Sequence, residues 1–154
     1  NQLKSIDEVI VSVGGGGLIS GIGGYLKQVQ PQIQMVACSP KNSCVMYESL
    51  NAGRILDLPS KQTLSDGTAG GVEEGSITFD ICKEIIDKFI LVTEKEIISG
   101  IRNTIDNDHQ LIEGSAGAAI AAFIKSKDRL IGKKVVIIIC GGNINSNTLS
   151  KILP

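Results

Sequence analysis

The sequence predicts an α/β fold, an open parallel sheet with helices on both faces, from three observations. Residues Glu8 to Val13 are mostly apolar and β-branched, which is typical of a buried strand. Four glycines, a helical pattern over Leu18 to Val29 and a second strand-like run from Ile33 to Cys38 follow. Because the connections between the two strands and the helix are short, the three elements imply a parallel βαβ unit. Finally, Lys133 to Cys140 is apolar on both faces, which indicates a central parallel strand covered on both sides.

The middle of the chain adds two helices and a long irregular segment. A helix is predicted over Ser43 to Ala52, and Gly53 ends it because glycine accepts the left-handed backbone that often follows a helix. Asp57 to Gly75 is rich in turn residues and has no regular period. Its length favours a functional loop over an ordinary surface loop. The next helix is predicted over Thr78 to Lys88, with Ser76 as its N-cap.

The second half of the chain again alternates strand and helix. Phe89 to Val92 predicts a short strand. Thr93, followed three residues later by Glu96, forms a capping box and predicts a helix from there to about Asn107. A helix of small residues begins at Gly114, which indicates that a neighbouring element such as the sheet packs closely against it.

Composition limits the classes of function. The chain has 154 residues, of which 42% are hydrophobic, and this predicts one α/β domain over residues 1–154 with a sizeable core. The absence of a long uninterrupted apolar run argues against a membrane partner. A net charge of −1, scattered basic residues and 3% aromatic residues argue against a nucleic-acid partner.

The cysteines and the single histidine argue against a zinc site and against a disulfide framework. The four cysteines contain no C-x-x-C pair, so a zinc site is not expected. A disulfide framework would be unusual in a chain of this size, which favours the reducing cytoplasm. No signal peptide is visible, and a start just ahead of a strand indicates a cut at a domain boundary. His109 is expected to be an exposed residue at a helix end rather than a base.

The four glycines after the first strand predict a phosphate-binding loop. Gly14, Gly15, Gly16 and Gly17 stand directly before the helix that begins near Leu18. A helix start has unsatisfied N–H groups and partial positive charge, and glycines let the main chain approach an anion. The alternative is a tight turn that needs small residues only for packing. Four consecutive glycines have a high entropic cost for that purpose, which favours the phosphate.

Two common phosphate ligands are disfavoured at this loop. The G-x-G-x-x-G fingerprint of dinucleotide-binding proteins is absent, and the next strand ends without the acidic residue that would bind a ribose. An ATP-binding P-loop needs Gly-Lys-Ser/Thr, but Gly132-Lys133 is followed by Lys134. NAD and ATP are therefore not the expected ligands.

Two further residues are candidates for the same site. Glu113 lies between an apolar pair and a helix start, so it is expected to be partly buried, and buried carboxylates normally have a partner. The alternative is a plain carboxylate at a helix N-terminus, worth ~0.3–1 kcal/mol. Cys140 is the last residue of the predicted strand with the clearest apolar pattern in the chain. Because ligands bind at the carboxyl ends of parallel strands, Cys140 and the glycine loop should face one crevice, although an ordinary buried cysteine is the alternative.

Four segments match the signatures of one enzyme family. They are Val13 to Gly21, Thr63 to Gly71, the Ile-Glu-Gly-Ser-Ala-Gly sequence around Glu113, and Cys140-Gly-Gly-Asn143. Together they resemble the fold-type II pyridoxal-phosphate enzymes, in particular the threonine/serine dehydratase and serine racemase branch. The resemblance runs over almost the whole chain, and it implies the larger, cofactor-binding domain of that fold in an incomplete form.

The resemblance implies a role in holding pyridoxal 5'-phosphate for eight residues. The glycine loop and Leu18 would bind the phosphate, and Gly67 would contact the pyridoxal ring. Glu113 would lie near the cofactor, and the thiol of Cys140 would meet the pyridine nitrogen. A neutral, weak donor at that nitrogen makes the ring a milder electron sink, which suits β-elimination. The full set is Gly14, Gly15, Gly16, Gly17, Leu18, Gly67, Glu113 and Cys140.

The implied function is an ammonia-lyase that deaminates a small amino acid, threonine or serine, to a 2-oxo acid and ammonia. That chemistry needs a Schiff-base lysine, which the family carries in a Ser-(Phe/Tyr)-Lys-x-Arg-Gly segment. No lysine of this chain has that context, so no catalytic residue is expected here. The chain would be the C-terminal part of a larger enzyme, inactive without the missing N-terminal segment and small substrate domain. Family members are often dimers, which implies a homo-oligomer.

Two alternatives stay open. The first is a serine racemase-type enzyme, whose metal-activated members hold a divalent cation with two carboxylates and a carbonyl. The corresponding positions here are Ser39, Ser43 and Val45, and a hard cation needs charged oxygen ligands. We therefore expect no metal site, which weakens the racemase hypothesis. The second is a non-catalytic domain that binds a phosphate or pyridoxal phosphate and acts through a partner.

Overall fold

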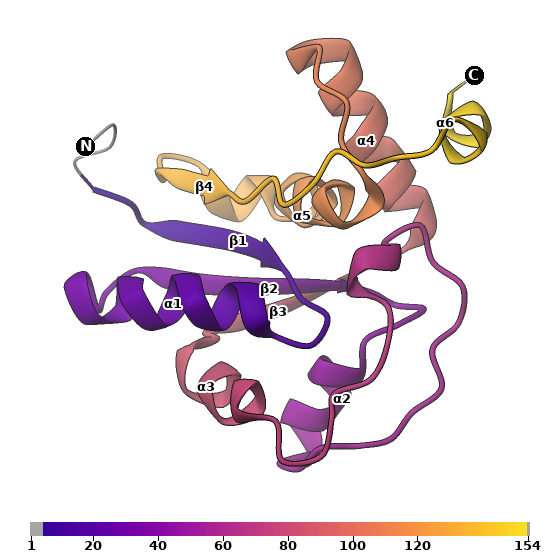
Figure 1. Cartoon of the computed structure of the whole chain (residues 1–154). Helices are drawn as coiled ribbons and strands as arrows, with labels where there is room; N and C mark the ends of the chain where they lie inside the picture. Colours follow the sequence, from indigo (N-terminus) through magenta and orange to yellow (C-terminus); the bar gives the residue numbers. More distant parts are fainter. Residues whose placement is uncertain (1–4, 154) are drawn as a thin grey trace.

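A four-stranded parallel sheet forms the centre of the computed structural model, which describes residues 5–153 (Figure 1). The strand order is β3-β2-β1-β4, and every neighbouring pair is parallel. In register, Ile10 of β1 lies beside Val36 of β2 and Ile137 of β4. The predicted open parallel sheet is therefore confirmed. The strands are β1 (Glu8–Ser12), β2 (Gln34–Pro40), β3 (Lys88–Val92) and β4 (Val135–Ile137).

Helices cover both faces of this sheet, as predicted. One face carries α1, α2 and α3, and the other carries α4 and α5 (Figure 1). None of the helices within residues 5–153 is long and apolar enough to cross a membrane. The helices are α1 (Gly17–Val29), α2 (Val45–Ala52), α3 (Ile77–Ile85), α4 (Glu94–Asp108), α5 (Gly114–Lys125) and α6 (Ser146–Ile152), with short 3-10 helices η1 (Asp66–Thr68) and η2 (Lys127–Leu130).

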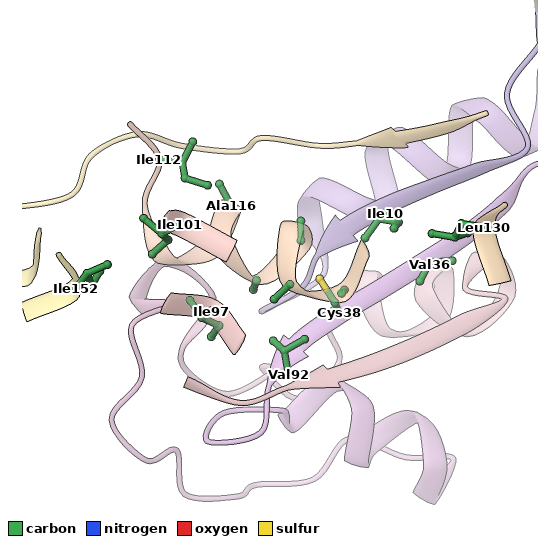
Figure 2. Packing of buried hydrophobic residues seen from close by; sticks show 14 residues of the cluster. Ile10, Val36, Cys38, Val92, Ile97, Ile101, Ile112, Ala116, Leu130 and Ile152 are labelled. Atoms are coloured by element: carbon green, nitrogen blue, oxygen red, sulfur yellow. The ribbon is translucent and has the colours of Figure 1, made fainter. Parts of the chain in front are cut away.

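The pleat of the strands divides the core into two clusters. Successive side chains of a strand point to opposite faces. Ile10 and Val36 therefore join the cluster under α4 and α5 (Figure 2), whereas Val9 and Met35 join the cluster under α1, α2 and α3. Both faces of β1 and of β2 after Gln34 are buried, which explains why the middle of each strand is a continuous apolar run rather than an alternating one.

The small residues of α5 allow two helices to lie very close together. A Cβ atom added to Gly100 of α4 would come within 2.6 Å of the carbonyl oxygen of Gly117 in α5. A Cβ added to Gly117 would come equally close, 2.6 Å, to the side chain of Ile101. The predicted close packing of this helix is therefore present, but it involves α4 as well as the sheet.

The strand predicted over Lys133 to Cys140 is shorter and less central than expected. β4 has only three residues and lies at the edge of the sheet, with β1 as its one neighbour among the described strands. Both faces of β4 are packed, because Val135 contributes to one core cluster and Val136 to the other. The apolar pattern predicted this burial on two faces correctly. It could not predict how many strands lie beside β4, because neighbouring strands pair through main-chain atoms, which every residue has.

Two helix boundaries also differ from the prediction by two or more residues. α2 begins at Val45, two residues late, and α3 ends at Ile85, three residues early. The early end has a tertiary cause. Asp87 accepts hydrogen bonds from the Met35 amide and the Lys27 ammonium group, both at 2.7 Å, and this contact turns the chain into β3. Ser76 stands at the N-cap of α3, but its hydroxyl pairs with Thr78 Oγ1 instead of a helix amide.

Two predicted helix signals are present as expected. Thr93 and Glu96 form the capping box at the start of α4, where the Thr93 hydroxyl accepts from the Glu96 amide and the Glu96 carboxylate accepts from the Thr93 amide. His109 ends the same helix as an exposed residue in the left-handed conformation, with φ at 54°. The segment from Asp57 to Gly75 is irregular apart from η1.

Candidate functional site

The glycine loop connects the carboxyl end of β1 to the first turn of α1. Gly16 is the N-cap of α1 and has φ of 86°, a conformation that side-chain-bearing residues rarely adopt. The first turn of α1 contains no acidic residue, so the partial positive charge of the helix start is not neutralised locally. A Cβ atom on Gly15 or Gly17 would meet no other atom within 4 Å. The main chain is therefore open on the side where an anion could approach.

All eight residues predicted for the site line one small cavity of about 240 Å³. The cavity lies at the carboxyl ends of the strands, where parallel sheets bind ligands. The structure thus brings together residues from four separate parts of the sequence. Its lining residues are Ser12, Val13, Gly14, Gly15, Gly16, Gly17, Leu18, Gly67, Thr68, Glu113, Ser115 and Cys140.

The 3-10 helix η1 forms one wall of the cavity. A Cβ atom on Gly14 would lie 2.8 Å from the carbonyl oxygen of Thr68, so the glycine loop and η1 are in direct main-chain contact. The Thr68 hydroxyl lies 2.6 Å from the Ser65 hydroxyl, and its amide donates to the Ser65 carbonyl at 3.0 Å. These bonds hold the short helix in shape and leave Gly67 facing the cavity.

Glu113 occupies the N-cap position of α5 without using its carboxylate as a helix cap. Instead, the Ser115 hydroxyl donates to its Oε1 atom at 2.5 Å, and the Asn143 amide donates to its Oε2 atom at 3.1 Å. A Cβ added to Gly141 would clash with the carboxyl group of Glu113. Glu113 is therefore half-buried and has partners, as the sequence predicted, and its carboxylate makes no capping hydrogen bond to α5.

Cys140 is the exposed member of the four cysteines, all of which are free thiols. Its sulfur lies 3.3 Å from the Ser12 hydroxyl at the end of β1. Cys38 differs from it, because complete burial raises the pKa of the Cys38 thiol far above its ordinary value. The alternative of an ordinary buried cysteine is thus wrong for Cys140.

Sequence reasoning missed three polar residues of this site. Ser12 contacts the thiol of Cys140, Thr68 contacts Gly14, and Ser115 holds Glu113. Ser115 stands two residues from Glu113, the residue that it contacts, and this spacing was the available signal. The contacts of Thr68 and Ser12 depend on segments distant in sequence, so the local pattern did not indicate them.

The three positions compared with the racemase metal site are occupied in other ways. The Ser39 hydroxyl is buried and donates to the Val13 carbonyl at 2.5 Å, and Ser43 lies 2.8 Å from the Ser60 hydroxyl. Val45 is part of the apolar core. Within the part of the chain that the structure describes, no group of three or more His, Cys, Asp or Glu side chains could hold a metal ion.

The cavity fits a ligand that carries a phosphate on a flat ring. The open glycine main chain and the start of α1 suit the anion. The Cα face of Gly67 and the thiol of Cys140 suit a ring with a polar edge. A parallel sheet with such a site at its carboxyl edge belongs to the class of α/β proteins that bind a phosphorylated cofactor.

The comparison with protein families agrees with this class. Residues 1–141 match the family model described as pyridoxal-phosphate dependent enzyme. The match covers most of the chain, so the chain belongs to this family. Pyridoxal phosphate is the cofactor of the family, and the donor set of the cavity fits that cofactor.

Individual relatives show which members of the family the chain resembles. The chain is 37% identical over 139 residues to a biosynthetic L-threonine dehydratase from Halalkalibacterium halodurans, matching 90% of this chain and 33% of the relative. It is 40% identical over 156 residues to a serine racemase from Dictyostelium discoideum, matching 99% of this chain and 48% of the relative. The chain therefore spans a third to a half of the length of these relatives.

The solved structures support the same fold. The processed form of threonine deaminase isoform 2 from Solanum lycopersicum superposes with a TM-score of 0.91 and is 32% identical. That match covers 98% of this chain and 44% of the tomato chain. In the tomato protein, the same open parallel sheet is therefore one segment of a longer chain.

Proposed function

We propose that the whole protein is a pyridoxal-phosphate-dependent ammonia-lyase that deaminates threonine or serine to a 2-oxo acid and ammonia. Family membership and the similarity to L-threonine dehydratases support the reaction class. The observation that carries the proposal is the convergence of all eight predicted residues on one cavity at the start of α1. The chain itself is the C-terminal part of the cofactor domain, which agrees with the share of each relative that it covers.

In this proposal the glycine loop binds the phosphate of the cofactor. The main-chain amides at Gly15, Gly16 and Gly17 and the first turn of α1 supply donors and partial positive charge. Leu18 closes the end of the loop, and Gly67 offers a flat main-chain surface to the ring. These residues orient the cofactor without forming a covalent bond to it.

Cys140 and Glu113 act on the polar edge of the ring. The bound cofactor supplies an electron sink for carbanion chemistry. Cys140 presents a neutral, weak hydrogen-bond donor to the ring nitrogen, and Ser12 holds its sulfur. Such a donor favours β-elimination, where a leaving group departs and little negative charge must persist on the ring. Glu113 places a carboxylate at the cavity wall between Gly67 and Gly141.

The base of the reaction belongs to the preceding segment of the longer protein. Among residues 5–153, no lysine lines the small cavity. We assign the Schiff-base lysine and the groups that grip the substrate carboxylate to that preceding segment, and we expect this chain alone to be inactive. The complete protein would be a homo-oligomer. Four unpaired thiols favour a reducing compartment such as the cytoplasm.

Cofactor binding by the purified chain tests the site. Pyridoxal phosphate should bind and raise the thermal midpoint, and borohydride reduction followed by peptide mapping should find no adduct at a unique lysine. A stoichiometric adduct at one lysine of this chain would overturn the assignment of the base to the preceding segment. Failure of the cofactor to bind would overturn the site itself.

Activity of the full-length protein tests the reaction. L-threonine and L-serine should each be assayed for release of ammonia and a 2-oxo acid, with and without pyridoxal phosphate. Release that depends on the cofactor is the expected result. Cofactor binding without any turnover would instead favour a non-catalytic binding domain.

Serine racemisation is the second candidate, because the Dictyostelium racemase is 40% identical over nearly the whole chain. The uncharged residues at Ser39 and Val45 count against the metal-activated form of that reaction. Chiral analysis of serine after incubation with the full-length protein separates the two reactions. Appearance of D-serine faster than pyruvate would favour the racemase.

A further inference from the structure

Glu113 lies at the boundary between two cavities. Its side chain lines the small cavity of about 240 Å³ and also a larger one of about 560 Å³. The larger cavity is bordered by α4, α5, α6 and the loop before η1, and it includes the amide side chains of Gln62 and Asn145. The direction of the Glu113 carboxylate therefore decides which of the two cavities receives its negative charge.

Two hydrogen bonds and one glycine determine this direction. The Ser115 hydroxyl donates to Oε1 of Glu113, and the Asn143 amide donates to Oε2, so each carboxylate oxygen has a donor of its own. The carboxyl carbon lies directly against the main chain at Gly141, which leaves little room on that side. Ser115 is only 3% exposed, so water cannot readily replace its hydroxyl.

The two donors are not equivalent. The Asn143 amide belongs to the main chain and is present whatever side chain the residue carries. The Ser115 hydroxyl is the one donor to Glu113 in this pair that a substitution can remove. Hydrogen bonds to charged groups are stronger than those between neutral groups, so the loss of this bond should release Oε1.

We propose that Ser115 is a positioning residue, whose hydroxyl keeps Oε1 of the Glu113 carboxylate turned toward the small cavity. Its consequence for the cofactor rests on the proposed function, whereas the hydrogen bond itself does not. Without the hydroxyl, Glu113 turns toward the larger cavity, where amide side chains offer other donors. The charge at the wall between Gly67 and Gly141 is then lost from the cofactor side.

A double-mutant cycle tests this role. S115A, E113A and the double variant are compared in their affinity for pyridoxal phosphate and in the ¹⁵N–¹H resonance of the Asn143 amide without ligand. S115A should weaken cofactor binding about five- to tenfold when Glu113 is present and less than about twofold in the E113A background. It should also move the Asn143 resonance only when Glu113 is present, because that amide reports on the carboxylate.

Two controls separate positioning from stability. S115T keeps a hydroxyl and should recover affinity and resonance, whereas S99A on the exposed surface of α4 should change neither. Equal effects of S115A in both backgrounds would overturn the proposal, as would an unmoved Asn143 resonance. If the unaltered chain fails to bind pyridoxal phosphate, the proposed function is wrong, and the resonance measurement alone still decides whether Ser115 positions Glu113.

Discussion

At the scale of single residues, Cys140 differs from the other cysteines in exposure. Burial raises the pKa of the Cys38, Cys82 and Cys44 thiols, whereas Cys140 is open to solvent at the candidate site. Thiol reagents attack the accessible thiolate form. We expect iodoacetamide to label Cys140 first, with C140S lacking the fast phase, as followed by peptide mass mapping.

The cofactor should protect the same thiol. At about ten times its dissociation constant, pyridoxal phosphate should slow Cys140 labelling about tenfold, because only the unbound fraction reacts. Cys44 is the internal control, since it lies outside the small cavity and its slower labelling should not change. Fast labelling of the fully buried Cys38 would contradict this structure.

Two glycines of the same chain segment allow a matched test of the phosphate loop. Gly15 and Gly24 both have open space where a Cβ would lie, but only Gly15 lines the small cavity. G15A should keep the fold and weaken pyridoxal phosphate binding by about tenfold or more, because the added methyl group blocks the anion's approach to the main chain. Calorimetric titration measures this change.

The Gly24 variant is the control for that measurement. G24A should bind the cofactor normally and gain about 0.5–1 kcal/mol of stability, because Gly24 lies within α1 and glycine disfavours helix. Equal affinity losses in G15A and G24A would show that the helix, and not the approach to the loop, determines binding.

At the scale of the elements, the capping box of α4 makes stability dependent on pH. Burial raises the pKa of Glu96, but hydrogen bonds from Thr93 and Lys125 outweigh burial and lower the pKa below its ordinary value. A carboxylate whose pKa is lower in the folded state adds stability above its unfolded pKa. That stability is lost as the pH falls through the folded pKa.

The variant E96Q tests this linkage. The difference in free energy of unfolding between the unaltered chain and E96Q should be largest at neutral pH and shrink as the pH falls through the lowered pKa of Glu96. Urea denaturation at several pH values measures it. E73Q, at an exposed loop position, should show no such trend. A difference for E96Q that is independent of pH would contradict the ionised capping interaction.

At the scale of the whole molecule, an ion pair between a buried carboxylate and a partly exposed guanidinium joins the beginning of the chain to its last third. Glu8 of β1 is fully buried and accepts two hydrogen bonds from the Arg129 guanidinium, at 2.5 and 2.7 Å. Lys133 lies 3.8 Å away from the same carboxylate. The pair holds η2 and the approach to β4 against the start of β1, the strand that leads into the glycine loop.

Removal of Arg129 should therefore destabilise the whole fold. R129A leaves a buried carboxylate without its main partner and should cost about 3 kcal/mol of unfolding free energy. K125A breaks a partly exposed pair with Glu96 and should cost under about 1 kcal/mol. Chemical denaturation of both variants provides the comparison. Similar costs for the two would mean that burial of Glu8 does not decide the energetics.

Local patterns predicted the parallel sheet, the helices on its two faces and most element positions. The glycine run, the capping box and the apolar runs each act through neighbouring residues, so the sequence displays them directly. Boundaries failed where a distant contact intervened. Asp87 ends α3 early because it binds Lys27 and Met35 across the fold, and no pattern near Asp87 indicates those partners.

By itself, the sequence determined the α/β fold class, because backbone propensity and apolar period are local properties. Its short motifs, through their resemblance to a known family, predicted the eight residues of the candidate site. The tertiary structure decided the rest. It placed β4 at the sheet edge, gave Glu113 its donors in Ser115 and Asn143, and buried Glu8 against Arg129. These features depend on lateral strand order and on contacts between distant segments, which form only when the chain packs into one core.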